Sequence, residues 1–438
     1  MTNDSIHRRE FVKGAAALGA TGLVAGSALG SIMKPRRDTL RVGVVGCGGR
    51  GTGAMLQALK ADPNAMLWSA GEAIGGRIEA SLGRVQAGLD AHAEEGGQPS
   101  GTIEVPAERM HVGFDAYQKV IDECDVVLLT TPPAFRPMQL AAAIAAGKHV
   151  FCEKPVAVDA PGVRQVLESA RKAKAKGLAV MSGFCWRYQD QCKETMSKLH
   201  EGGVGDLHTI QTTYNTTGWV RPNPKQDDWS ETEFQLRNWQ YFTPLSGDHI
   251  VEQAVHAIDW IAWAMQDEPP VKCWAVGGRQ TRPDIPETGN VFDHFSVTYE
   301  YSNGQRASHM CRHWPNTPSD NSAYFLGSDG RCTMQPWTGQ HVIEGANKWR
   351  GEAAANDMYQ REHDVLFASI RDNNPINDGE RMSHTTLMAI MARMAAYTGE
   401  VVTWEQAMES AENLNPDPFT FGDRPRPSIA VPGVTKFA

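Results

Sequence analysis

One glycine-rich turn restricts the fold of this chain more than any other feature. The segment 46–51 reads GCGGRG, follows the β-branched run 40–45 and precedes an apolar helical pattern over 54–59. A strand, a GxGxxG turn and a helix start in this order let backbone amides and the helix dipole approach a pyrophosphate. The unit predicts a sheet that binds a dinucleotide. Its candidate binding residues are Gly46, Gly48, Gly49, Arg50 and Gly51.

The end of the second strand bears on the choice between NAD and NADP. The apolar run 66–70 predicts this strand, and a ribose-binding carboxylate is expected where it ends. The chain has Gly71 at that place, followed by Glu72. Either Glu72 substitutes for the usual acid, or Arg77 meets the 2′-phosphate of NADP, and the sequence leaves both choices open.

Strand and helix patterns alternate up to about residue 190, which is typical of a doubly wound parallel sheet. Segments 110–113 and 124–130 predict strands, and 136–146 predicts a helix. The polar, Gly-rich stretch 83–106 is interpreted as an insertion with a surface helix. Thr131 and Pro132 follow the strand at 124–130, in a turn suited to lie near the nicotinamide half of a dinucleotide.

The most pointed chemical signal is Glu153-Lys154-Pro155, which ends another apolar strand. Pro155 keeps Lys154 extended and stops the strand, so the ammonium is held at a fixed place. Glu153 and Lys154 are therefore candidate cofactor contacts, and Lys154 is also a catalytic candidate. The alternative is a loop with a surface salt bridge.

A second catalytic candidate lies on the segment 250–265, which is apolar almost all round and predicts a buried helix. Polar side chains inside such a helix are costly unless they are used. Glu252, His256 and Asp259 have the spacing that places them on one stripe. The alternative for His256 is a core histidine with its hydrogen bonds satisfied.

Beyond residue 190 the patterns favour a sheet with one face on a core. Alternating apolar residues over 207–214, 271–276, 295–301 and 306–312 predict its strands, and Asn303-Gly304 predicts a hairpin turn. Helices are predicted over 358–371 and 384–397. His363 is favoured to lie on the polar face of a surface helix, and the alternative is a site residue. A Pro-rich tail begins at Pro416 and is expected to wrap the surface.

A long segment without strand patterns, 215–245, is rich in aromatic residues. Aromatic faces beside hydrogen-bonding groups suit a sugar, and the alternative is that each ring only packs the loop against the domain. Its aromatic and polar residues are Trp219, Trp229, Trp239, Tyr241, Phe242, Arg221, Arg237 and Asn238. Trp239 and Asn238, together with Arg187 and Asp259, are the candidate substrate residues.

The N-terminus has the pattern of a targeting signal. Arg8 and Arg9 precede Phe11 and Lys13, and a weakly apolar Ala/Gly-rich run follows over 14–30. This resembles a twin-arginine export signal and predicts an exported, periplasmic protein that begins between about residues 28 and 37. A membrane anchor is the alternative, although the run is short and rich in Gly and Ala.

Charge and cysteine content exclude several classes of function. The net charge is −9 and no basic cluster lies outside the N-terminus, which argues against a nucleic-acid partner. The eight cysteines have no CxxC or zinc spacing, so no metal site is expected. We interpret them mostly as small buried apolar residues, with a disulfide as the alternative.

These motifs together resemble the glucose-fructose oxidoreductase / inositol dehydrogenase / MocA (Gfo/Idh/MocA) family over nearly the whole mature chain. The resemblance rests on the GxGxxG turn, on Thr131-Pro132-Pro133, on Glu153-Lys154-Pro155 and on the helix around 252–259. It implies that Lys154 lies beside the nicotinamide and the substrate hydroxyl. The family has an acid-x-x-x-His pair on the corresponding helix, usually with Asp, so Glu252 is a departure. Triplets like Trp186-Arg187-Tyr188 lie near the domain junction in the family.

The expected architecture is α/β. Residues 1–36 are signal and linker, 37–190 a Rossmann domain, 191–415 an α+β domain with a large, open, mainly antiparallel sheet, and 416–438 the tail. The expected activity is NAD(P)-dependent oxidation of a ring hydroxyl of a sugar, glycoside or polyol, with a non-exchanging cofactor and homo-oligomers formed through the C-terminal sheet. The alternatives are an NAD-dependent glycoside hydrolase or lyase that works by transient oxidation, whose family tends to lack the Glu-Lys-Pro lysine, and a non-catalytic sugar-binding protein.

Overall fold

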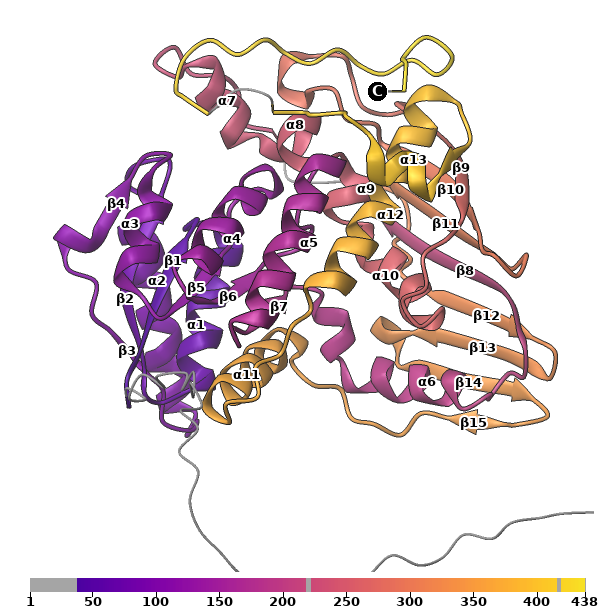
Figure 1. The fold of residues 1–438 in the computed structure, drawn as a ribbon, viewed down its shortest axis with the longest axis horizontal. Helices are drawn as coiled ribbons and strands as arrows, with labels where there is room; N and C mark the ends of the chain where they lie inside the picture. Colours follow the sequence, from indigo (N-terminus) through magenta and orange to yellow (C-terminus); the bar gives the residue numbers. More distant parts are fainter. Residues whose placement is uncertain (1–37, 218–221, 416–418, 438) are drawn as a thin grey trace, which may run out of the picture. The chain divides into compact units, whose positions relative to one another are not determined.

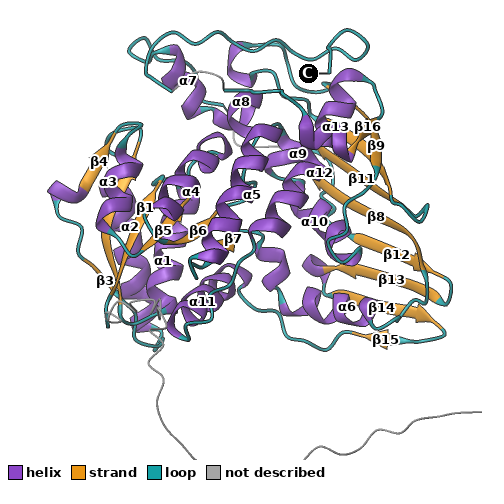
Figure 2. Cartoon of the chain, viewed as in Figure 1, coloured by secondary structure: helices purple, strands orange, loops and turns teal. Residues whose placement is uncertain are grey.

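The N-terminal sheet is the doubly wound parallel sheet that the glycine turn predicts. The computed structural model describes residues 38–217, 222–415 and 419–437, and the predicted export signal lies outside them. All strand pairs of this sheet are parallel, in the order β3-β2-β1-β5-β6-β7 with β4 beside β2 (Figures 1 and 2). Its strands are β1 Leu40–Val45, β2 Ala65–Glu72, β3 Thr102–Ile103, β4 Met110–Val112, β5 Val126–Leu129, β6 His149–Cys152 and β7 Val180–Ser182. Its helices are α1 Gly49–Ala61, α2 Arg77–Glu94, α3 Ala116–Glu123, α4 Arg136–Ala145 and α5 Ala160–Ala175.

Two local predictions in this region are wrong. Strand β2 continues to Glu72 instead of ending at residue 70, because Gly71 still pairs with Val45. The stretch 83–106, expected to be an insertion with a surface helix, does contain a helix up to residue 94, but this helix is the second half of α2, which begins at Arg77 and buries Val85 in the core of the sheet. Its polar composition reflects its outer face only.

The C-terminal sheet is mixed and mostly antiparallel. Its order is β15-β14-β13-β12-β8-β11-β10-β9-β16, and only β8 and β11 run parallel. Its strands are β8 Leu207–Thr216, β9 Lys272–Gly278, β10 His294–Glu300, β11 Arg306–His313, β12 Ala323–Gly327, β13 Gly330–Gln335, β14 Gln340–Gly345, β15 Trp349–Arg350 and β16 Val402–Thr403. The two sheets confirm the predicted fold class.

Helices cover one face of this sheet (Figure 1). They are α6 Asp190–His200, α10 Val255–Ala264 and α12 Gly379–Thr398. Phe295, Val297 and Tyr299 alternate toward the helices and are buried, whereas Val276 and Met310 are exposed. The remaining helices are α7 Glu231–Arg237, α8 Thr243–Ser246, α9 His249–Glu252, α11 Met358–Arg371 and α13 Trp404–Glu409.

The predicted helix over 250–265 is in fact two helices. Helix α9 ends at Glu252 and α10 begins at Val255, so Gln253 and Ala254 form a break between the two catalytic candidates. A second correction concerns His363, which is fully buried instead of lying on a surface. Helix α11 packs on α1 of the Rossmann sheet, which encloses this side chain.

The Pro-rich tail runs along the molecule over the described residues 419–437 (Figure 1). Thr232 of α7 donates two hydrogen bonds to the carbonyl of Gly422, and Gly433 donates one to Thr398. All eight cysteine thiols are buried and free. Within the described ranges, no helix has the length and apolar character needed to cross a membrane.

Candidate active site

The glycine turn has the shape that a pyrophosphate requires. Gly46 has φ +97°, and a Cβ there would lie 2.8 Å from the Thr131 amide nitrogen. A Cβ on Gly51 would lie 2.0 Å from the Gly46 carbonyl oxygen, so the turn closes tightly onto α1. In contrast, no atom lies within 4 Å of the Cβ position of Gly48, and no side chain caps α1. The open space and the uncapped amides at the helix start fit a dinucleotide phosphate.

A cavity of about 470 Å³ extends from this turn. Its size is in the range of cofactor sites. Besides the turn it is lined by Arg50, Glu72, Ile74, Arg77, Phe114, Tyr117, Thr131, Pro132, Phe135, Gln139, Leu236, Trp239 and Gln240, among others. The cavity therefore brings together the glycine turn with Arg50, Glu72, Arg77, Thr131 and Pro132. Glu153 and Lys154, the other predicted cofactor contacts of this sheet, and Gly51 are not among its lining residues. The cavity also shows that the segment after β8 closes over the cofactor side.

Glu72 is the strand-end acid of this cavity. Its carboxylate accepts hydrogen bonds from the Cys47 amide at 2.8 Å and the Ala73 amide at 2.8 Å. The acid therefore connects the glycine turn to the end of β2, where a ribose is expected. Gly71 lies inside β2, with its Cβ position 3.0 Å from Val120 of α3. Arg77 also lines the cavity, and no hydrogen bond or ion pair involves it among the described residues.

Glu72→Gln is expected to raise the share of NADP that the protein carries about tenfold relative to NAD. The carboxylate repels a 2′-phosphate, whereas Arg77 attracts it, and tenfold corresponds to about 1.4 kcal/mol. The measurement is the NAD to NADP ratio released on denaturation. Glu79→Gln, an exposed acid in the first turn of α2, is the matched control. An unchanged ratio in Glu72→Gln would contradict the assignment of Glu72 to the ribose.

Lys154 reaches from the end of β6 to the break between α9 and α10. Its ammonium donates to the Glu252 carbonyl oxygen and lies 3.6 Å from the Glu252 carboxylate. Both side chains are mostly buried. The Glu153 carboxylate accepts the Lys154 amide at 3.0 Å. The structure therefore brings two of the catalytic candidates, Lys154 and Glu252, together.

Arg50 connects the glycine turn to this strand end. Its guanidinium donates to Glu153, to Glu362 at 2.7 Å and to Gln57 at 2.7 Å. Burial opposes its charge, but the two neighbouring carboxylates outweigh burial and raise the Arg50 pKa. Although Arg50 lines the cavity, its donors are thus directed toward Glu153 and α11 instead of a phosphate.

His256 lies on the first turn of α10, and its ring stacks on Trp186 with centroids 4.8 Å apart. Burial, followed by the charges of Lys154 and Arg50, lowers its pKa well below the usual range. The ring is consequently neutral near pH 7, and its Nδ1 is buried without a hydrogen-bond partner. A neutral imidazole beside an ammonium has the charge state that a general base needs.

The candidate substrate residues have other contacts. Arg187 forms a bidentate ion pair with Asp259 at 2.7 and 2.8 Å, and both are buried. Asn238 uses its amide within its own loop, accepting from Asn223 at 2.7 Å. Trp239 lines the cofactor cavity. The predicted roles of these four residues in binding substrate stay predictions, since these contacts are all with other parts of the protein.

The predicted aromatic sugar platform over 215–245 is not a single surface among the described residues. The Trp229 ring lies under the Arg237 guanidinium at 4.3 Å, and Phe242 is buried in a core. Residues 218–221, which include Trp219, lie outside the described part of the chain. The aromatic rings next to His256 are instead those of Trp186 and Phe184, and Trp186 also contacts Trp337 at 5.6 Å.

Sequence reasoning missed Glu362 on α11 and placed its neighbour His363 on a surface. Glu362 is fully buried, and burial raises its pKa well above the usual range although Arg50 opposes this. The His363 ring stacks on Phe151 at 4.3 Å. The adjacent Glu-His pair was the only local signal, and its burial depends on α1. In the described segments, no three His, Cys, Asp or Glu side chains are placed to hold a metal.

Comparison with protein families agrees with this geometry. Residues 40–184 match the oxidoreductase family with an NAD-binding Rossmann fold, and residues 194–333 match the GFO/IDH/MocA C-terminal domain. The chain belongs to the Gfo/Idh/MocA family. Membership in the Gfo/Idh/MocA family confirms the resemblance that the sequence motifs indicated, and it places this chain among NAD-binding oxidoreductases.

Individual relatives are distant. Mouse trans-1,2-dihydrobenzene-1,2-diol dehydrogenase is 26% identical over 240 residues, which are 54% of this chain and 63% of that enzyme. The match thus spans less than two thirds of this relative. Aldose-aldose oxidoreductase from Caulobacter crescentus, solved with glycerol, has TM-score 0.62 at 18% identity, covering 83% of this chain and 99% of that one. Levoglucosan dehydrogenase with NADH and L-sorbose has TM-score 0.64 at 16% identity, covering 83% and 98%. At these identities the solved structures show a shared fold.

Proposed function

We propose that this protein is an NAD-dependent oxidoreductase that acts on a ring hydroxyl of a sugar, glycoside or polyol. One observation carries the proposal: the Lys154 ammonium lies on Glu252, in the same turn region as the neutral His256. Carbohydrates named with the structural neighbours, an aldose and levoglucosan, support this substrate class. NAD is favoured over NADP because Glu72 ends β2 in the cofactor cavity.

The residues of the chain divide the work of oxidation. When bound, the nicotinamide supplies a hydride acceptor. His256 takes the proton of the hydroxyl, since its imidazole is neutral near pH 7. Lys154 stabilises the negative charge that develops on the substrate oxygen. Glu252 holds the ammonium through its carbonyl oxygen, and its carboxylate balances the charge.

The experiment is the absorbance spectrum of purified protein before and after addition of a panel of sugars. Appearance of the reduced-nicotinamide band with one sugar supports the oxidoreductase. Release of an aglycone without net reduction would replace it with the redox-neutral hydrolase or lyase. A panel in which sugars bind but neither event occurs would favour a binding protein.

Three further parts of the proposal concern the cellular context. The twin-arginine pattern at residues 8–9 supports export to the periplasm, with the cofactor already in place and held without exchange. Val276, Met310 and Leu326 are exposed on the sheet face opposite the helices, which supports homo-oligomers formed through that face. Sedimentation of the purified protein measures this last point.

A further inference from the structure

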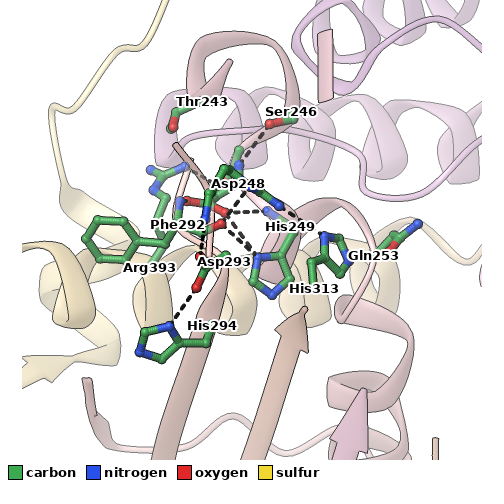
Figure 3. A network of polar contacts seen from close by, with 12 residues as sticks. Thr243, Ser246, Asp248, His249, Gln253, Phe292, Asp293, His294, His313 and Arg393 are labelled. Carbon is green, nitrogen blue, oxygen red and sulfur yellow. Dashed lines mark hydrogen bonds and ion pairs between the residues drawn. The ribbon is translucent and has the colours of Figure 1, made fainter. Parts of the chain in front are cut away.

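A buried polar network extends from Asp248 and His249 to His313 and Gln253, next to the break between α9 and α10 (Figure 3). It begins at Asp248, whose backbone has φ 80° and ψ 163°, a conformation that non-glycine residues rarely adopt. The Asp248 carboxylate accepts the His249 amide at 2.6 Å, the Phe292 amide at 2.8 Å and the Tyr397 hydroxyl. Such strain persists only where surrounding contacts fix it. The start of α9 is therefore held in one position.

The other end of the network fixes the protonation of His313. Arg282 lies 3.4 Å from His313 Nδ1, and a guanidinium only donates hydrogen bonds, so Nδ1 is the acceptor. The proton of the neutral ring is then on Nε2, which donates to the Gln253 side-chain oxygen at 2.7 Å. Burial and the neighbouring His249 and Arg282 lower the His313 pKa well below its usual range, which agrees with a neutral ring.

This chain of contacts decides which way the Gln253 amide points. Because Oε1 accepts from His313, the Nε2 group carries two donors directed elsewhere, and the only side-chain hydrogen bond of Gln253 to the described residues is the one that Oε1 accepts. His249 and His313 are buried, whereas Gln253 is only partly buried. The network thus reaches accessible space at Gln253. This residue lies between Glu252, which receives the Lys154 ammonium, and His256.

We propose that the Gln253 amide donates a hydrogen bond to a substrate oxygen, namely a hydroxyl on the ring carbon next to the one oxidised. The proposal rests on the proposed function and adds a requirement to it. With its oxygen occupied, Gln253 recognises a hydrogen-bond acceptor only. A substrate that lacks this hydroxyl, or that carries an ammonium group in its place, is therefore disfavoured.

The test uses the panel sugar that reduces the bound nucleotide and its monodeoxy analogues. In wild-type protein, kcat/KM is expected to be at least about tenfold lower with one of the analogues than with the parent sugar. This is the usual scale when a polar group, here the Gln253 amide, is left unpaired. Gln253→Leu should lose a similar factor with the parent sugar, mainly through KM, and no further factor with that analogue. Gln253→Glu keeps an acceptor for His313 and replaces the donor by a carboxylate oxygen, which can only accept, so it should also lower kcat/KM with the parent sugar. Gln165→Leu, exposed on α5, is the control.

The outcomes separate the two proposals. If no sugar reduces the nucleotide, the proposed function fails and this inference fails with it. If a sugar is oxidised but, in both Gln253 variants, kcat/KM still falls from the parent sugar to each analogue by the same factor as in wild-type protein, the inference alone is overturned. His313→Leu adds a check on the orientation of the amide, because it frees Gln253 to rotate and should reduce the discrimination between parent and analogue.

Discussion

Lys154→Ala is expected to lower turnover about a hundredfold or more while the nucleotide stays bound. A positioned charge or proton-transfer group contributes on this scale. Lys154 is held at the end of β6 by Glu153 on its amide and by Glu252 on its ammonium, so its position is well defined. The glycine turn and Glu72, which fit the nucleotide, are on other elements. Turnover under saturating sugar and the nucleotide content of the same preparation are the two measurements.

The same variant should also change the pH dependence of activity. Burial and the charges of Lys154 and Arg50 lower the His256 pKa, so the neutral base persists well below pH 6.5. Activity that needs neutral His256 is then lost only as the pH falls through this lowered value. Removing Lys154 takes away one of the causes, so the His256 pKa rises and the acidic limb of kcat/KM moves to higher pH. A merely structural loss would reduce activity without moving the limb.

Lys148→Ala provides the matched control. Lys148 precedes the same strand, β6, and donates to the Cys124 carbonyl at 2.6 Å, far along the strand from the catalytic candidates. Its replacement removes an ammonium from the same region of the fold and should leave turnover and pH profile near wild type. Near-wild-type turnover in Lys154→Ala itself would rule out its catalytic assignment.

The sequence predicted those features whose causes are local. The strand, glycine turn and helix of 40–61 follow from neighbouring residues, and so does the place of Lys154 at a strand end. The fold class followed from the alternation of such units. The extent of β2 was missed because Gly71 reads as a turn residue, whereas its pairing with Val45 keeps it in the strand.

The misplaced features depend on contacts between distant residues. The apolar pattern of 250–265 is continuous, and on a continuous helix Gln253 would lie about 100° away from Glu252, off the stripe. The break places Gln253 within reach of His313, 60 positions later in the sequence. Likewise, nothing within 215–245 indicates that Trp239 faces the cofactor cavity, because its position depends on how the segment packs against the first sheet. The burial of His363 depends in the same way on α1.

Protein purified without added nucleotide, desalted and denatured is expected to release close to one nicotinamide nucleotide per chain. The proposed twin-arginine signal is of the kind that exports folded proteins, and no comparable nucleotide pool is expected outside the cytoplasm. Micromolar affinity, about −8 kcal/mol, would lose the cofactor by dilution, so binding several kcal/mol tighter is needed. A cofactor that stays bound must be restored in place in each cycle, by a second sugar or keto-sugar, by an external electron carrier or by a redox-neutral reaction.

The structure shows how such retention is possible and supplies a variant that tests it. Phe114 and Phe135 line the cofactor cavity. Two rings of the tail pack against them: the centroid of Phe421 lies 4.7 Å from that of Phe114, and the centroid of Phe419 lies 4.4 Å from that of Phe135. Replacing both tail phenylalanines by alanine should lower the nucleotide retained after desalting by tenfold or more, since about 1.4 kcal/mol of lost packing suffices for tenfold. Val434→Ala, at an exposed tail position, should retain it fully. Empty wild-type protein that needs millimolar NAD would refute retention and indicate a cytoplasmic dehydrogenase with a misinterpreted N-terminus, whereas full retention in the double variant would show that the tail does not hold the cofactor.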